Sequence, residues 1–212
     1  MHESDSRRRD SVRLPSGARA IQGVATHEMK TPIFQAAVAT ALAIQFVHYF
    51  VAGMRAFSRP KLDDAGEMAG AVFCIAGAGV LIMARIFRIA VVNGVIALAL
   101  VVASLFLYEW ARRTVRGRGF FVIYSDNVPE SVCESGPYAY VRHPLYLSYI
   151  IGFSATLVAF PNVFAAIGWA LAVAWFVYGA QHDERALRES ALASDYAEYR
   201  HRTGMFIPVF RR

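Results

Sequence analysis

Charged residues are scarce in this sequence. Asp, Glu, Lys and Arg make up 18% of the 212 residues, whereas soluble domains carry about 25%. Hydrophobic residues make up 56%, and the mean hydropathy is +0.36. This shortage of charge excludes an ordinary soluble domain and indicates an integral membrane protein.

Cysteine is equally rare. Cys74 lies in an apolar run and Cys133 in a polar loop, so the two form neither a disulfide framework nor a zinc site. The third glycine of a dinucleotide-binding loop is missing after Gly77-Ala78-Gly79, and so is the strand that precedes such a loop. We therefore expect no metal site, and this stretch gives no sign of a nucleotide site.

An apolar core is missing after the three arginines at positions 7–9, so we do not expect a cleavable signal peptide. We expect residues 1–31 to form a polar, weakly ordered N-terminal tail. The net charge of +6 comes mostly from arginine. Because these arginines lie between long apolar runs, they indicate charge beside a membrane rather than a nucleic-acid partner.

Long apolar runs, in contrast, are abundant. A membrane-spanning helix needs about 20 predominantly apolar residues. Five segments fit or approach this length, and they are residues 33–54, 66–84, 89–111, 145–160 and 163–180. The fourth is short, so we expect it to form a tight hairpin with the fifth. Gln45 and His48 lie inside the first segment and should face other helices.

The predicted fold is an all-α integral membrane protein. It has about five transmembrane helices and a cytoplasmic C-terminal helix. Arginines crowd the loop at 112–142 and the stretch after 180, which places both on the cytoplasmic face, with the N-terminus outside. The expected location is a bacterial inner membrane. After the tail, residues 32–111 would form three transmembrane helices. Residues 112–212 would form the cytoplasmic loop, two further transmembrane helices and the C-terminal helix, with Gly204 as its expected cap.

The first gathering of polar residues is the stretch 136–146, which reads GPYAYVRHPLY. Gly-Pro is turn chemistry, and Pro144 suits the first position of a helix. Arg142 and His143 would place donors at a positive helix end, where an anion binds readily. The tyrosines suit a membrane interface, so an ordinary aromatic and basic anchor would need the same residues.

The second gathering is the acidic pair Asp183-Glu184, just after the fifth apolar segment. Carboxylates at a helix start are favoured by the helix dipole, which alone could explain the pair. A carboxylate site that faces an arginine-histidine site would, however, suit a zwitterionic ligand. The methionine part of S-adenosyl-L-methionine is such a ligand.

These residues resemble the isoprenylcysteine carboxyl methyltransferase and phospholipid methyltransferase group. The pattern G-P-Y-x-Y-V-R-H-P-x-Y lies at 136–146, the acidic pair with a leucine three positions on at 183–187, and Y-x-E-Y at 196–199. The resemblance extends from about residue 110 to residue 208.

The resemblance implies a membrane-embedded methyltransferase that binds S-adenosyl-L-methionine in a cytoplasmic cofactor pocket, with residues 112–212 as its catalytic core. Its lipophilic substrate would enter sideways between helices. The implied cofactor-binding residues are Glu130, Ser131, Val132, Cys133, Tyr138, His143, Pro144, Leu145, Tyr146, Asp183 and Glu184.

We hypothesise that Arg142, His143 and Glu184 are catalytic. Arg142 and His143 would orient charge on the cofactor or substrate, and the acidic pair would hold the cofactor. An amine or hydroxyl acceptor would also need a proton acceptor, for which His143 or Glu184 are candidates.

Two departures from the family keep the substrate open. The family usually has Glu-Glu at Asp183-Glu184, and members that act on prenylcysteine tend to carry an arginine about one turn earlier, where this chain has Tyr178-Gly179-Ala180. The acceptor could be an isoprenylcysteine-like carboxylate or another small lipid. Two alternatives remain, an NADPH-dependent membrane reductase related to sterol reductases and a non-catalytic membrane protein.

Overall fold

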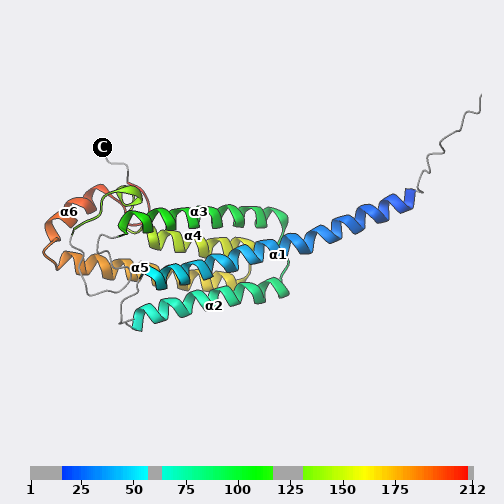
Figure 1. Cartoon of the computed structure of the whole chain (residues 1–212), viewed down its shortest axis with the longest axis horizontal. Helices are drawn as coiled ribbons and strands as arrows, with labels where there is room; N and C mark the ends of the chain where they lie inside the picture. Colours follow the sequence, from blue (N-terminus) through cyan, green and yellow to red (C-terminus); the bar gives the residue numbers. More distant parts are fainter. Residues whose placement is uncertain (1–15, 57–63, 117–130, 210–212) are drawn as a thin grey trace, which may run out of the picture. The chain divides into compact units, whose positions relative to one another are not determined.

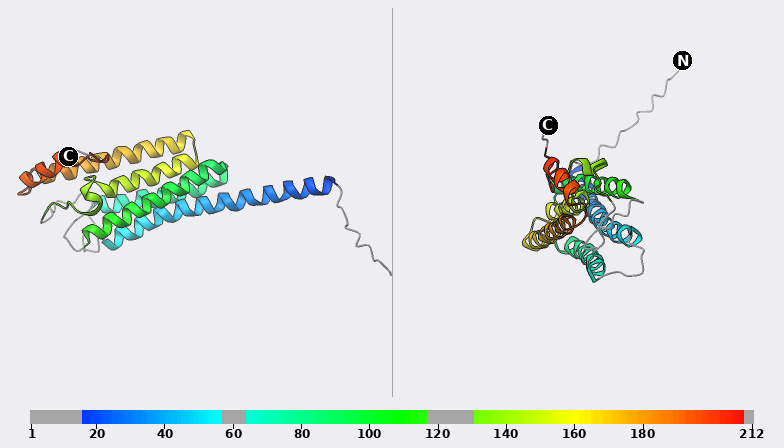
Figure 2. Two further views of the ribbon diagram at one scale, coloured as in Figure 1. Left: turned by 90° about the horizontal axis from the view of Figure 1, so that it is seen from above. Right: turned by 90° about the vertical axis from the view of Figure 1, so that its left-hand side faces the viewer.

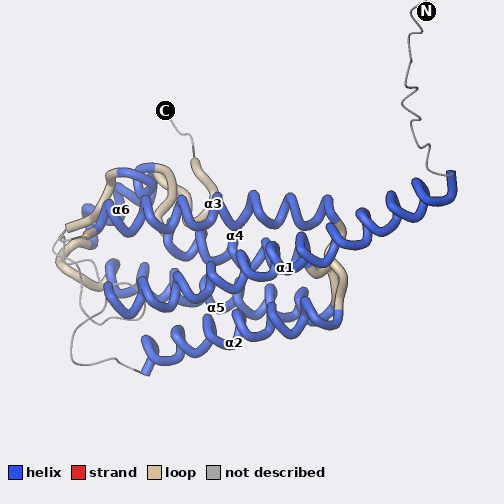
Figure 3. The backbone as a smooth tube through the Cα atoms, turned by 45° about the vertical axis from the view of Figure 1, so that its right-hand side comes forward, coloured by secondary structure: helices blue, strands red, loops and turns tan. Residues whose placement is uncertain are grey.

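The computed structural model describes residues 16–56, 64–116 and 131–209, with side chains for 32–52, 70–116 and 131–209. Within these ranges the chain forms six α-helices, one 3₁₀ helix and an isolated β-bridge. Figure 3 shows these helices joined by loops. The prediction of an all-helical protein is confirmed for this part of the chain. The chain divides into two compact units, Met1–Phe34 and Gln35–Arg212, and the candidate site described below lies in the second.

The first helix, α1, runs from Ser16 to Ala56 with Pro32 inside it. The sequence predicted that the helix begins at about residue 32, and this start is wrong, because α1 already begins at Ser16. A proline is favoured at a helix start, but membrane helices also tolerate it in their interior, so it does not mark the boundary here.

Among the described residues, three helices are long and apolar enough to cross a membrane, namely Pro32–Ala52 within α1, Val91–Val115 (α3) and Val163–Arg188 (α5). The apolar part of α2 (Asp64–Ile86) and the whole of α4 (Pro144–Ala159) are shorter. The chain is therefore a membrane protein by the length and composition of its helices. The predicted total of five spans stays a prediction.

Helices α3, α4 and α5 lie side by side (Figures 1 and 2). The turn between α4 and α5 is tight, as predicted, because Asn162 caps α5 by accepting hydrogen bonds from the backbone N–H groups of Phe164 and Ala165. This reversal carries the chain back, so the start of α4 and the end of α5 lie at the same end of the bundle (Figure 1).

Aromatic rings fill the interior of the bundle. The Tyr149 ring of α4 lies 4.8 Å from Tyr49 of α1 and 5.1 Å from Phe176 of α5. Gln45 and Ser104 are buried in the same interior, and Ser104 donates to the Gln45 side chain at 3.4 Å. The prediction that the polar residues of the first segment face other helices is confirmed for Gln45.

The C-terminal region differs from its prediction. The charged stretch after residue 180 continues α5 to Arg188, and a separate helix, α6, follows at Ala193–Arg202. Thr203 caps α6 in an extended conformation, so Gly204 is not the cap that the sequence indicated.

Candidate functional site

The turn that leads into α4 is fixed by Gly136. This residue begins the 3₁₀ helix η1 (Gly136–Ala139) with a φ of +59°, which L side chains rarely adopt. A Cβ atom there would also lie 2.5 Å from the Thr114 hydroxyl and 3.2 Å from the Trp110 indole nitrogen of α3. Glycine therefore allows η1 to pack directly on the end of α3.

His143 is the residue before α4, and Pro144 is the first helical position, as the sequence predicted. The backbone carbonyl of His143 accepts from Leu147, which starts the helix. Its ring nitrogen Nε2 lies 3.4 Å from Oε1 of Glu184 on α5. The start of one helix thus directs an imidazole at the end of another.

Arg142 and Glu184 form the central ion pair of the site. The Arg142 Nε donates to Glu184 Oε1 at 2.9 Å, and the side chains are only 8% and 4% exposed. A buried carboxylate is costly unless it is paired and hydrogen-bonded. Arg142 and His143 together supply those partners. We call these three residues the Glu184 cluster.

The acidic pair lies near the C-terminal end of α5, not at a helix start. The sequence-based explanation through the helix dipole is therefore wrong, since that end of a helix disfavours negative charge. Arg185 and Arg188 in the last turn offset this, and Arg188 donates to the Glu184 carbonyl at 3.1 Å. The dipole alone gives no reason for carboxylates here.

Asp183 has different surroundings from Glu184. Its carboxylate accepts a hydrogen bond from the Tyr146 hydroxyl at 2.8 Å, and its side chain is 28% exposed. The Tyr146 ring stacks on His143 at 5.6 Å and lies 6.0 Å from Phe176. Of the two acids, Asp183 is the more accessible and Glu184 the more firmly held.

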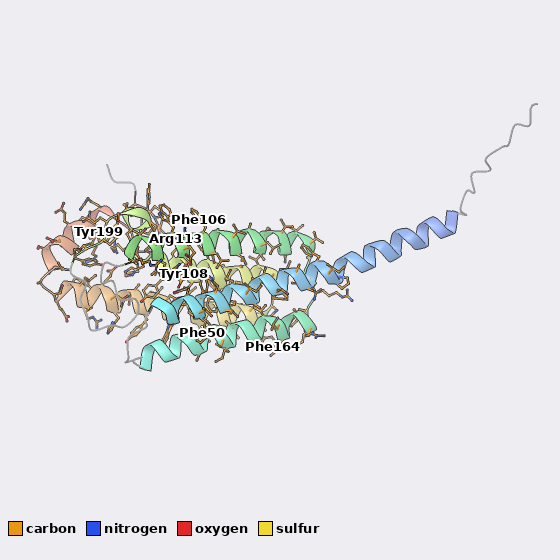
Figure 4. All side chains as sticks on the ribbon, in the orientation of Figure 1. Phe50, Phe106, Tyr108, Arg113, Phe164 and Tyr199 are labelled. Atoms are coloured by element: carbon orange, nitrogen blue, oxygen red, sulfur yellow. The ribbon has the colours of Figure 1, made fainter. Side chains whose placement is uncertain are left out.

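Three tyrosines surround the cluster on the side of α6. Tyr199 lies on α6 (Figure 4). Its hydroxyl donates to the Tyr138 carbonyl at 2.7 Å and so ties α6 to η1. Burial raises the pKa of Tyr138, Tyr199 and Tyr196, and the nearby Glu184 carboxylate raises that of Tyr196 further. These phenols therefore stay neutral and can act as hydrogen-bond donors.

The remaining predicted residues lie around this centre or outside the described ranges. Pro144 and Leu145 are buried in the first turn of α4. Cys133 is buried near Tyr138, and its Sγ lies 3.6 Å from the Ser135 hydroxyl. Ser131 is exposed and Val132 half-buried. Glu130 lies outside the described residues.

Sequence reasoning missed the contribution of the residues after α6. Arg142 Nη1 donates to the carbonyls of Thr203 and Arg200, and the Phe206 ring lies 6.1 Å from the His143 ring. A single phenylalanine near a chain end carries no recognisable signal. Gly204 did stand out, but as a helix cap.

A segment of the chain matches a known protein family. Residues 96–189 match the isoprenylcysteine carboxyl methyltransferase (ICMT) family. The ICMT match includes Arg142, His143 and both acids but ends before α6, and it confirms the resemblance inferred from the motifs. It implies methyltransferase activity at a membrane. No curated protein and no solved structure matches the chain.

Proposed function

We propose that this protein is an S-adenosyl-L-methionine-dependent methyltransferase that acts on a lipophilic acceptor at the cytoplasmic face of a membrane. The observation that carries the proposal is the Glu184 cluster. Its basic and acidic partners are 42 positions apart in the sequence yet form a buried ion pair, inside the segment that matches ICMT.

The side chains at the site are complementary to the charged groups of this cofactor. The methionine part carries an ammonium group. It can donate hydrogen bonds to the Asp183 carboxylate, which is partly exposed. The methionine part also carries a carboxylate, which His143 and the first backbone N–H groups of α4 can bind. The rings of Tyr146 and Phe176 suit a sulfonium cation, which aromatic faces attract.

The other predicted residues would complete the cofactor site. Tyr138, Pro144 and Leu145 line the turn into α4, and residues 130–133 precede that turn in the chain. We propose that these residues shape the site and exclude water, while Asp183 supplies a charged contact and His143, in its neutral form, a hydrogen bond.

The chemistry asks little of the protein beyond positioning. The bound cofactor supplies an already activated methyl group, so the protein mainly aligns the acceptor and excludes water. A carboxylate acceptor needs no base, whereas an amine or hydroxyl acceptor must lose a proton. His143 is a better candidate than Glu184 for the group that accepts this proton. The Glu184 Oε1 already faces both Arg142 and His143.

The acceptor is more consistent with a small lipid than with a prenylcysteine carboxylate. Members that act on prenylcysteine tend to carry an arginine about one turn before the acidic pair. Here Tyr178 at that level is exposed, and Gly179 and Ala180 are buried. A cation that could hold a substrate carboxylate is therefore missing from this turn of α5.

A binding measurement on the purified protein in lipid nanodiscs tests the proposal. Titration calorimetry should detect S-adenosyl-L-methionine and give no heat with NADPH. Binding of NADPH alone would instead identify a membrane reductase. Binding of neither would favour a non-catalytic membrane protein and would contradict the proposal.

A further inference from the structure

The segment Thr203–Phe206, which follows α6, pairs with the turn before α4. A parallel bridge joins Val141 to Gly204. The backbone N–H of Arg142 donates to the Gly204 carbonyl at 2.8 Å, and that of His143 to the Met205 carbonyl at 3.2 Å. We call residues 203–206 the C-terminal strap, because they hold the backbone of two residues of the Glu184 cluster.

Side chains strengthen this attachment. Arg142 bridges Glu184 on α5 and the carbonyl of Thr203 in the C-terminal strap. The Thr203 hydroxyl donates to the Tyr199 carbonyl at 2.8 Å, which anchors the C-terminal strap to α6. The cluster and the C-terminal strap therefore share a network of hydrogen bonds.

Two aromatic rings flank His143. Tyr146 stacks on it at 5.6 Å, and Phe206 from the C-terminal strap lies 6.1 Å away with an interplanar angle of 52°. Both distances are typical of ring pairs in contact. The backbone bonds fix where His143 sits, and the two rings limit how its imidazole can rotate.

The path of the C-terminal strap depends on Gly204. A Cβ atom at this position would overlap the carbonyl oxygen of Ile207 and lie 3.1 Å from Val209 Cγ2. The chain can therefore turn back after the strap only with a glycine at position 204. Position 204 therefore needs glycine because the backbone of Ile207 passes close to it. Gly136 differs, since it is a glycine with a positive φ.

We propose that the C-terminal strap is a part of the methyl-transfer site, and that Phe206 is the positioning residue for His143. The inference rests on the proposed function, but it concerns residues outside the ICMT match. Without the Phe206 ring, the imidazole can leave the orientation that places Nε2 near Glu184. The productive orientation is then less populated, and transfer slows.

The test compares three variants in nanodiscs. They are Phe206→Ala, Phe206→Tyr and Ile207→Ala, the last at a neighbouring position that is 78% exposed. Transfer of the labelled methyl group from S-[methyl-³H]adenosyl-L-methionine to a bacterial total lipid extract gives kcat and KM for the cofactor. Calorimetry gives the cofactor Kd, and thermal unfolding reports stability.

Phe206→Ala should lower kcat/KM about three- to tenfold, the size expected for the loss of one ring pair. Phe206→Tyr should restore it, and Ile207→Ala should match the unaltered protein. Unchanged kcat/KM and Kd in Phe206→Ala would overturn the proposal. Equal losses in Phe206→Ala and Phe206→Tyr, in step with lower unfolding temperatures, would also overturn it, because they indicate a purely structural role.

The two proposals fail in different ways. An unaltered protein that binds no S-adenosyl-L-methionine contradicts the proposed function. An unaltered protein that binds and transfers, with a Phe206→Ala variant that does so equally well, contradicts only the role of the C-terminal strap.

Discussion

Two clusters in the described part of the chain have nearly the same composition, each a glutamate with arginine and histidine partners. In the Glu184 cluster the partners come from a distant part of the chain, and the side chains are almost fully buried. In the second, which we call the Glu109 cluster, Glu109 pairs with Arg112 at 2.6 Å, Arg113 at 3.5 Å and His48 at 3.0 Å.

The Glu109 cluster is built differently. Both arginines follow Glu109 on the same helix by three and four positions, and only His48 comes from another helix. The Glu109 and His48 side chains are 24% and 40% exposed. Such pairs are common helix-surface contacts of small net energy. Composition alone therefore does not mark a site, whereas burial and convergence from distant segments do.

The largest expected difference between the clusters concerns the arginines. Arg142→Ala removes the main partner of a buried carboxylate and a tie to the C-terminal strap, so it should abolish methyl transfer. Loss of one partner of a buried pair costs about 3–5 kcal/mol. Arg112→Ala leaves Glu109 with two other partners and should cost about 1 kcal/mol or less.

Thermal unfolding and lipid methylation of both variants in nanodiscs measure this contrast. Equal destabilisation by the two substitutions would mean that burial does not distinguish the clusters.

The histidines give the next contrast. His143→Ala should lower methyl transfer roughly 10²- to 10⁴-fold if His143 takes a proton from the acceptor. His48→Ala should leave the rate unchanged. Initial rates of lipid methylation at saturating cofactor check both. A rate loss in His48→Ala as large as that in His143→Ala would move the chemistry to the Glu109 cluster.

A smaller effect is expected at Gly204, which tests whether the Glu184 cluster depends on the distant C-terminal strap. Gly204→Ala forces a Cβ against the Ile207 carbonyl and should cost about 1–3 kcal/mol, as overpacking does. Methyl transfer should fall with it. Gly79→Ala on α2 is the control, because its added Cβ meets nothing within 4 Å. Thermal unfolding of both variants gives the answer, and equal stability would contradict it.

The smallest effect concerns Tyr146. Tyr146→Phe keeps the ring beside His143 but removes the hydroxyl that donates to Asp183. The hydroxyl only orients Asp183, so its loss should weaken cofactor binding by about 1 kcal/mol, which is roughly fivefold in Kd. Tyr140→Phe, at an exposed ring of the same turn, should leave the calorimetric Kd unchanged. No difference between the two would exclude Asp183 from the cofactor site.

Much of the fold could be predicted because apolar runs of membrane length are a strong signal. The breaks near Arg88 and Pro161 and the start of α4 at Pro144 followed from local chemistry. The start of α1 could not be predicted, since Pro32 is also tolerated inside a helix. The end of α5 was predicted at residue 180, where the apolar run stops, but the helix continues through charged residues to Arg188. A change in polarity therefore does not mark the end of a helix.

Part of the candidate site could also be predicted from the sequence, and part could not. Arg142, His143 and Glu184 stood out because polar residues beside apolar runs are conspicuous. The contacts of the C-terminal strap did not, since they are made by backbone carbonyls of Thr203, Gly204 and Met205, which any residue carries. Pairing of two irregular segments leaves no periodic pattern in the sequence.

The most direct test is methyl transfer by Glu184→Gln and Glu109→Gln, two substitutions that keep shape and remove one charge. The labelled methyl group of S-adenosyl-L-methionine and a total lipid extract serve as substrates. Glu109→Gln should transfer like the unaltered protein, and Glu184→Gln should transfer nothing measurable while it still inserts into the membrane. Normal transfer by Glu184→Gln would contradict a site built on the Glu184 cluster.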